Sequence, residues 1–210
     1  MAKTSGGTRG MEQVKAYEVK ASASNYSARR KAKNEADANA LEGQGYNVTR
    51  DLHENGAYAA IIGNHKEHEI AVVNILAENG FASTLDKEGN LKIKLKNGRE
   101  FTLPSGDGRV EDFTMEIAAL TGNASAGKVA DGIAHSFKAF NPVKGHDVQS
   151  NIAITITPKG TGSRFSRFDI DNGVREFRRR VRENETSARP IAYLHIDENL
   201  RKVWYRSVKT

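Results

Sequence analysis

The sequence predicts an α/β fold, in which a mixed central β-sheet is flanked by helices and preceded by an N-terminal helical arm. Short apolar, β-branched segments with the two-residue period of strands alternate with longer segments of helical period. Such alternation implies a sheet with helices packed on its faces. The chain has 210 residues, which is long enough to bury a substantial hydrophobic core.

The N-terminal part differs in composition from the rest. Residues 1–12 are rich in Gly, Ser, Thr and Lys, and we expect a disordered tail. Residues 12–41 predict a helix with a thin apolar stripe that lies on something larger, and the stripe consists of alanines spaced by four: Ala28, Ala32, Ala36 and Ala40. Glycines at 43 and 45 end this helix. We therefore expect an arm over 13–50 and a compact α/β domain over 51–210.

The first half of the compact domain contains one clear helix. Residues 58–62 are a short apolar run, read as a strand or a buried turn. In the segment that follows, Asn64 can cap a helix, Gly80 can end it, and one stripe is apolar: Ile70, Val73, Leu76 and Ala77. Residues 81–85 are a further short segment, followed by a turn over 86–90, and 110–120 are an expected strand region. Between them, 91–95 and 100–103 form a predicted hairpin around Asn97-Gly98.

The second half continues the alternation. Residues 128–140 predict a helix, and 151–157 are the clearest strand because apolar β-branched residues recur at every second position. Asp171-Asn172-Gly173 is interpreted as the cap of a helix over 174–185. Residues 190–196 and 202–206 predict two closing strands.

Composition excludes several classes of protein. There is no Cys, which excludes disulfide scaffolds, thiolate zinc sites and cysteine nucleophiles. No apolar run reaches the roughly 18 residues of a membrane helix, and the start shows no signal peptide, so we expect a cytoplasmic protein without membrane partners.

Charge is distributed unevenly along the chain. The net charge of +6 divides into +4 over residues 1–50, −3 over 51–160 and +5 over 161–210. Basic ends around an acidic middle suit a protein that attracts a polyanion and holds carboxylates for a metal. The alternative is that these charges only solvate the surface.

An acidic cluster between residues 107 and 116 is the first candidate site. If 112–116 are extended, Asp112, Thr114 and Glu116 share one face of a strand. Carboxylates grouped this way suit Mg²⁺ or Mn²⁺, which can activate water and clamp a scissile phosphate. Asp107, Asp112 and Glu116 are therefore predicted metal ligands, and an exposed turn with ordinary surface acids is the alternative.

An arginine-rich segment is the second candidate. The helix over 174–185 and the aromatic-containing stretch before it predict contacts with phosphates and bases, through Arg164, Arg167, Arg175, Arg178, Arg179, Arg180 and Arg182. A solvated helix face is the alternative reading. Among the histidines, His135 and His195 are candidates for proton transfer, while His65 and His68 lack the further spaced ligands of a metal site.

From residue 65 to 206, the order of elements resembles the C-terminal tRNase domain of contact-dependent growth inhibition toxins, which also occurs in phage and mobile-element proteins. In that family an opening helix ends in a Leu-Ala-x-x-Gly-like stop, as in Leu76-Ala77-Glu78-Asn79-Gly80, and an Asp precedes a Glu-x-Lys by about nine residues. Asp107 and Glu116 stand at that separation, Gly122-Asn123-Ala124-Ser125 resembles the family's loop, and 128–140 resembles its Lys-rich helix.

The family's lysine would fall at Ala118, and in such nucleases it orients water and stabilises phosphate charge. Either Lys128 or Lys138 reaches the site instead, or the domain binds without cutting. We expect a nuclease-like domain acting on RNA or DNA, with Asp107, Glu116, Lys128 and His135 as catalytic residues, a divalent metal, and possible immunity or assembly partners. The alternatives are a non-catalytic nucleic-acid-binding or assembly protein of a phage or mobile element, and a structural module that binds no nucleic acid.

Overall fold

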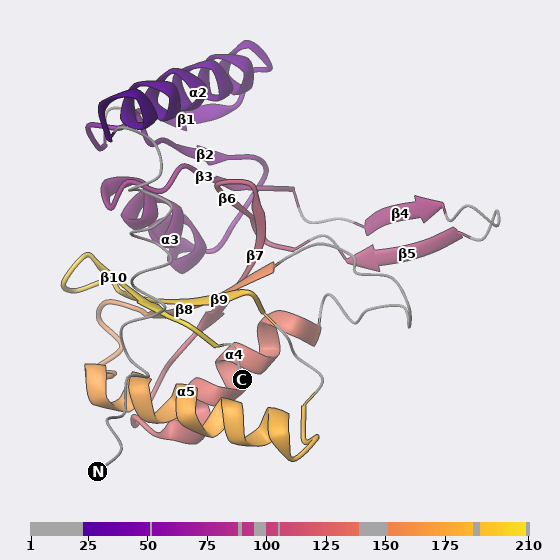
Figure 1. The fold of residues 1–210 in the computed structure, drawn as a ribbon, viewed down its shortest axis with the longest axis vertical. Helices are drawn as coiled ribbons and strands as arrows, with labels where there is room; N and C mark the ends of the chain where they lie inside the picture. Colours follow the sequence, from indigo (N-terminus) through magenta and orange to yellow (C-terminus); the bar gives the residue numbers. More distant parts are fainter. Residues whose placement is uncertain are drawn as a thin grey trace.

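The computed structural model describes residues 23–50, 52–87, 90–94, 100–104, 106–138, 151–186 and 190–208. These residues form four helices, one eight-stranded mixed sheet and a separate two-stranded sheet, which confirms the α/β fold (Figure 1). The predicted tail over 1–12, the helix expected over 12–22 and the Asn97-Gly98 turn lie outside the described residues. Within the described parts, no helix is long and apolar enough to cross a membrane.

The helices are α2 (Ala23–Gly43), α3 (Glu67–Glu78), α4 (Ala126–Lys138) and α5 (Arg167–Arg182). The strands are β1 (Asn47–Thr49), β2 (Ala59–Ile61), β3 (Ser83–Leu85), β4 (Asn90–Lys94), β5 (Glu100–Pro104), β6 (Gly108–Val110), β7 (Phe113–Ala119), β8 (Asn151–Thr157), β9 (Ala192–Asp197) and β10 (Lys202–Arg206).

The large sheet has the order β1-β2-β3-β6-β7-β8-β9-β10. The β2–β3, β7–β8 and β8–β9 pairs are parallel, and the other pairs are antiparallel. β8 is buried along 152–157 on both faces, as expected for a parallel strand in the middle of a sheet with helices on each side.

Helices cover both faces of the sheet in three groups. α3 packs on one face through an apolar cluster that includes Val73, Leu76 and Ile154. On the opposite face, α4 and α5 cover one end and share a second cluster with Ala153. α2 covers the other end through a small cluster with Ala60. Strand pairing across β2, β3, β6, β7 and β8 places α2 and the α4–α5 pair on the same face, and Figure 1 shows them at opposite ends of the molecule.

α3 confirms the apolar stripe but begins differently from the prediction. Its N-cap is Lys66 rather than Asn64, and Glu69 reaches back to accept a hydrogen bond from the Lys66 N–H at 3.0 Å. Gly80 follows the helix with φ +85°, a conformation that favours glycine, so the predicted stop is confirmed.

α5 begins seven residues earlier than predicted, at Arg167. The Ser166 hydroxyl accepts a hydrogen bond from the Asp169 N–H, and the Asp169 carboxylate accepts one from the Ser166 N–H at 2.8 Å. Gly173 was interpreted as part of a cap, but it lies inside the helix. A Cβ there would stand 2.2 Å from the Val129 Cβ, so glycine permits α5 to approach α4 closely.

The strand region expected over 110–120 is two strands. Glu111 and Asp112 form a tight turn between β6 and β7, and Glu111 has φ +53°. Asp112 therefore does not share a strand face with Thr114 and Glu116, and that prediction was wrong.

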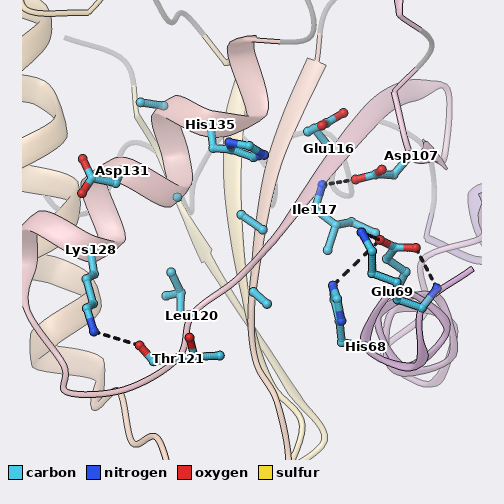
Figure 2. Close-up of a pocket in the computed structure, with 15 residues that line it drawn as sticks. His68, Glu69, Asp107, Glu116, Ile117, Leu120, Thr121, Lys128, Asp131 and His135 are labelled. Carbon is cyan, nitrogen blue, oxygen red and sulfur yellow. Dashed lines mark hydrogen bonds and ion pairs between the residues drawn. The ribbon is translucent and has the colours of Figure 1, made fainter. Parts of the chain in front are cut away.

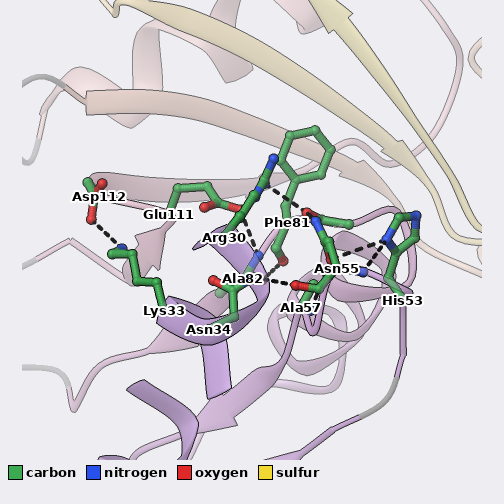
Figure 3. Close-up of polar contacts among 12 residues, drawn as sticks. Arg30, Lys33, Asn34, His53, Asn55, Ala57, Phe81, Ala82, Glu111 and Asp112 are labelled. Carbon is green, nitrogen blue, oxygen red and sulfur yellow. Dashed lines mark hydrogen bonds and ion pairs between the residues drawn. The ribbon is translucent and has the colours of Figure 1, made fainter. Parts of the chain in front are cut away.

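α2 packs through a different face from the one predicted. Ala28, Ala32, Ala36 and Ala40 are exposed, whereas Asn34 and Ala38 are buried against the domain. Alanine side chains are small, so the alanine stripe would bury little apolar area. The face that contains Arg30 and Asn34 instead forms hydrogen bonds with the domain (Figure 3). After α2, β1 pairs with β2, so strand pairing crosses the boundary expected at residue 50.

Candidate functional site

A pocket of about 800 Å³ lies where the sheet opens beside β7. β7 pairs with β6 only up to Met115, whereas residues 116–119 continue with β8 alone among the described strands. Asp107, just before β6, lines the pocket together with the first turn of α3, the second half of β7 and the inner side of α4 (Figure 2). The pocket therefore forms because β6 extends along β7 only as far as Met115.

Asp107 and Glu116 come together at this opening. The Asp107 carboxylate accepts a hydrogen bond of 2.6 Å from the N–H of Ile117, the residue after Glu116. Both carboxylates line the pocket and are half-buried, and Figure 2 shows them side by side. The hydrogen bond takes the place of a strand pair, so it holds Asp107 at a fixed position along β7.

α4 contributes the opposite wall. Lys128, Asp131 and His135 line the pocket from successive turns of this helix, and Figure 2 shows the His135 ring directed toward Glu116. The Lys128 ammonium donates to the Thr121 carbonyl at 2.9 Å. Asp131 is bound by Arg180 of α5 at 2.6 Å, which fixes this wall to the helix behind it.

Ala118 also lines the pocket, and its small side chain has a packing reason. It faces Gly132 of α4, where an added Cβ would lie 2.8 Å from the Thr155 Cγ2 and 3.9 Å from the Ala118 Cβ. Helix α4 therefore crosses close to β7 at this point. The resemblance places a lysine here, but the lysines that line the pocket among the described side chains are Lys66, the N-cap of α3, and Lys128 of α4.

The first turn of α3 adds three residues that the sequence analysis did not assign to the site: Lys66, His68 and Glu69. Glu69 is 3% exposed and accepts hydrogen bonds from the Lys66 N–H and ammonium, the latter at 3.1 Å. Burial alone would raise the pKa of Glu69, but the Lys66 hydrogen bonds outweigh it and lower the pKa. Glu69 lies one turn before the buried Val72 and Val73, so a carboxylate on an apolar helix face was the available signal.

Asp112 lies apart from the pocket. Its side chain is 78% exposed and pairs with Lys33 of α2 at 2.9 Å. It belongs to the β6–β7 turn, whereas the other two predicted ligands belong to the strand edge. Within the described ranges, no group of three or more His, Cys, Asp or Glu side chains is arranged to hold a metal ion.

The α5 arginines have local partners. Arg179 pairs with Glu176, Glu183 and Glu185, and Arg180 pairs with Glu176 as well as Asp131. Hydrogen bonds from both arginines lower the pKa of the Glu176 carboxyl to about 2. Arg178 donates to the Ser207 carbonyl and Arg175 to Asn172, whereas Arg164, Arg167 and Arg182 are exposed. Phe165 is buried in the core and Phe168 is 67% exposed.

His195 is a core residue outside the pocket. It is fully buried, its Nδ1 lies 2.8 Å from the Thr155 hydroxyl, and its ring stacks on Trp204. Burial, and then the charge of Arg206, lower its pKa to about 3, so the imidazole is neutral near pH 7. His65 is also enclosed, and its Nε2 donates to the Ile62 carbonyl at 3.0 Å.

Comparison with known proteins finds no matching family model, no similar curated protein and no similar solved structure.

Proposed function

We propose that this pocket is the site of a nuclease-like domain that cleaves phosphodiesters of RNA or DNA with a divalent metal. The observation that supports it best is the placement of Asp107 beside Glu116 at the open edge of β7, fixed by the 2.6 Å hydrogen bond to Ile117. Lys128 and His135 line the same pocket from the facing helix. Carboxylates, a lysine and an imidazole around one cavity are the groups that metal-assisted hydrolysis uses.

The donor set fits Mg²⁺ or Mn²⁺ better than a metal held entirely by protein ligands. Mg²⁺ commonly takes one or two carboxylates and completes its shell with waters and substrate phosphate oxygens. Asp107 and Glu116 supply that number, and a bound divalent ion would lower the pKa of water and offset phosphate charge.

The chain's own groups then divide the remaining work. Asp107 and Glu116 would hold the ion, and the hydrogen bond to Ile117 would keep Asp107 in place. Lys128 and Lys66 would lie near phosphate oxygens and assume the charge-stabilising role of the lysine absent at Ala118. His135, which is exposed, would transfer a proton to or from the leaving oxygen.

Cleavage of tRNA and of plasmid DNA by the pure chain, with Mg²⁺, Mn²⁺ or EDTA, tests the proposal. We expect metal-dependent cleavage, and a loss of more than about 100-fold in Asp107→Asn and Glu116→Gln, since electrostatic groups in active sites contribute at least that much. Calorimetric titration of Mg²⁺ should show weaker binding in the same variants.

Two variants sharpen this test. Glu54→Gln removes an exposed carboxylate outside the pocket and should leave cleavage unchanged. Asp112→Asn should also retain cleavage, in contrast to the ligand set expected from sequence. If neither polymer is cleaved with any of the metals, the catalytic proposal is contradicted and a non-catalytic nucleic-acid-binding protein is favoured. In that case Asp107 only accepts the hydrogen bond from the Ile117 N–H at the edge of β7.

A further inference from the structure

The segment that leads into α5 is anchored by alternate residues. Ser163 and Phe165 are buried, whereas Arg164 between them is exposed. The Ser163 hydroxyl accepts a hydrogen bond of 2.7 Å from the Gly122 N–H. Gly122 follows Thr121, which lines the pocket, so this segment begins beside the rim of the pocket.

The first two turns of α5 continue this exposed side of the chain. Arg167 is exposed, and so is the ring of Phe168. Arg175 follows Phe168 by seven residues, which is about two helical turns, so the two side chains share one side of the helix. Figure 1 shows α5 at the edge of the molecule, against α4. We call Arg164, Arg167, Phe168 and Arg175 the α5 surface.

The acidic side chains around the α5 surface already have partners. Asp169 accepts hydrogen bonds from the Ser166 N–H and hydroxyl, at 2.8 and 2.6 Å. The other acids of this region pair with arginines outside the α5 surface: Asp171 with Arg206, and Glu176, Glu183 and Glu185 with Arg179.

The arginines of the α5 surface have no such pairing. Among the described residues, Arg164 and Arg167 have no carboxylate partner, and Arg175 donates to the Asn172 side-chain oxygen at 3.1 Å. The α5 surface therefore carries three positive charges that no described acid neutralises.

Helix stability does not account for the first two of these charges. The helix dipole favours cations in the last turn, where Arg179, Arg180 and Arg182 lie, and disfavours them at the N-terminus. Arg167 is the first residue of α5, and Arg164 precedes the N-cap residue, Ser166. An anion that binds from outside the chain explains their position.

We propose that the α5 surface binds single-stranded nucleic acid, with its arginines at backbone phosphates and Phe168 stacked on a base. The planar guanidinium group matches phosphate oxygens, and a single strand offers base faces that a duplex keeps stacked. An anionic membrane is a poorer match, because Phe168 is the one large apolar side chain exposed on α5. The inference goes beyond the proposed function, since this binding requires neither a metal nor cleavage.

Fluorescence anisotropy of the full chain tests this with three labelled probes: oligo(dT), oligo(U) and a DNA duplex. EDTA is present, so that metal-dependent cleavage does not consume the probes. We expect both single strands to bind, and the triple variant Arg164→Gln, Arg167→Gln and Arg175→Gln to bind them roughly 10-fold or more weakly at low salt. Loss of three phosphate contacts on a single strand should reduce the slope of log K against log salt by about 2.

Substitution of Phe168 separates base stacking from charge. Phe168→Ala should weaken single-strand binding about fivefold or more but leave duplex affinity within about twofold, because only unstacked bases can lie on the ring. Phe168→Trp should retain single-strand binding, since it keeps an aromatic face.

Matched substitutions elsewhere are the controls. Arg29→Gln, Lys159→Gln and Lys202→Gln remove three exposed charges outside the α5 surface and should weaken binding by less than about threefold, which is the general effect of net charge. Tyr46→Ala removes an exposed ring elsewhere and should leave binding unchanged. The three single arginine substitutions repeat the measurement if circular dichroism shows that the triple variant is unfolded.

Three results would overturn the inference: equal losses in the triple variant and its charge-matched control, single-strand binding that is unchanged in Phe168→Ala, or equal losses of single-strand and duplex binding in that variant. The first result, together with arginine-dependent binding to phosphatidylserine vesicles, would instead assign the α5 surface to a membrane. Metal-dependent cleavage with binding that does not depend on the α5 surface would refute this inference alone. Single-strand binding through the α5 surface without cleavage would refute the proposed function alone.

Discussion

The two ends of one sheet face are covered in different ways. α4 and α5 are held over β8 and β9 by a continuous apolar cluster, with Val129, Phe177 and Tyr193 among its buried members. α2 is held over β1–β3 by a small cluster of mostly alanine and by polar contacts, among them the Arg30 hydrogen bonds to Gly80 and Glu111.

The difference between apolar and polar attachment corresponds to how close each group of helices lies to the pocket. α4 forms a wall of the pocket, so its position relative to β7 must be fixed, and close packing at Gly132 and Gly173 does this. α2 instead contacts the β6–β7 turn at Glu111 and Asp112, at the far end of the strands from the pocket (Figure 3). Apolar packing therefore fixes α4 beside the pocket, whereas hydrogen bonds and ion pairs attach α2 to the end of the sheet farther from it.

The largest effect is expected at the apolar end. Phe177→Ala removes a ring that is 1% exposed and leaves a cavity between α5 and the sheet, which should lower the free energy of unfolding by about 3–5 kcal/mol. Urea denaturation followed by circular dichroism measures it. Phe168→Ala, on the same helix but 67% exposed, is the control and should change stability by less than about 0.5 kcal/mol. Equal losses in the two variants would contradict the assigned core.

An intermediate effect is expected at the polar end. Arg30→Ala removes donors to the Gly80 carbonyl at 2.9 Å and to the Glu111 carboxylate at 2.5 Å, leaving Glu111 with the Ala82 N–H. We expect a loss of about 1–3 kcal/mol, because the part-buried Glu111 carboxylate loses its charge-assisted hydrogen bond from Arg30. A double-mutant cycle with Glu111→Gln should give a coupling above about 0.5 kcal/mol, and additive losses would argue against a direct contact.

The smallest effect is expected at the exposed pair of Lys33 and Asp112. The hydrogen bond to Asp112 raises the pKa of Lys33 above 10.5, so the pair's stabilisation is present below that pH and is lost as pH rises through the folded-state pKa. We expect Lys33→Met to cost at most about 1 kcal/mol near neutral pH. The difference from wild type, measured by urea denaturation, should begin to shrink as pH rises past 10.5, disappear once pH exceeds the raised pKa of Lys33, and be smaller in high salt. A difference that persists at high pH would point to packing by the lysine stem.

The sequence predicted the sheet and helices wherever period and composition agreed. β8 and α3 are examples, because their apolar positions recur with a clear period and are buried. The start of α5 was mistaken because Gly173 is a helix breaker by propensity, and only the approach of Val129 explains it there. The face of α2 was mistaken because hydrogen bonds to Gly80 and Asn55, distant in sequence, choose it over the alanine stripe.

For the candidate site, spacing along the chain was informative only in part. Asp107, Glu116, Lys128 and His135 were proposed from sequence and line one pocket. Their catalytic roles stay a prediction. Asp112 is adjacent to this set in sequence but separated from it by the turn at Glu111, whose φ of +53° could not be read from residue types. The residues at the start of α3 were not predicted, because they reach the pocket only through tertiary packing of α3 beside the edge of β7.

The two edges of the large sheet have a consequence for how the protein behaves at high concentration. An unpaired strand edge can add a strand from another copy and so start aggregation. β1 has only three residues and lies against α2, while β10 begins and ends with charged residues, Lys202 and Arg206. Short length at one edge and charge at the other oppose edge-to-edge growth, so a sheet of eight strands can remain a single molecule's sheet.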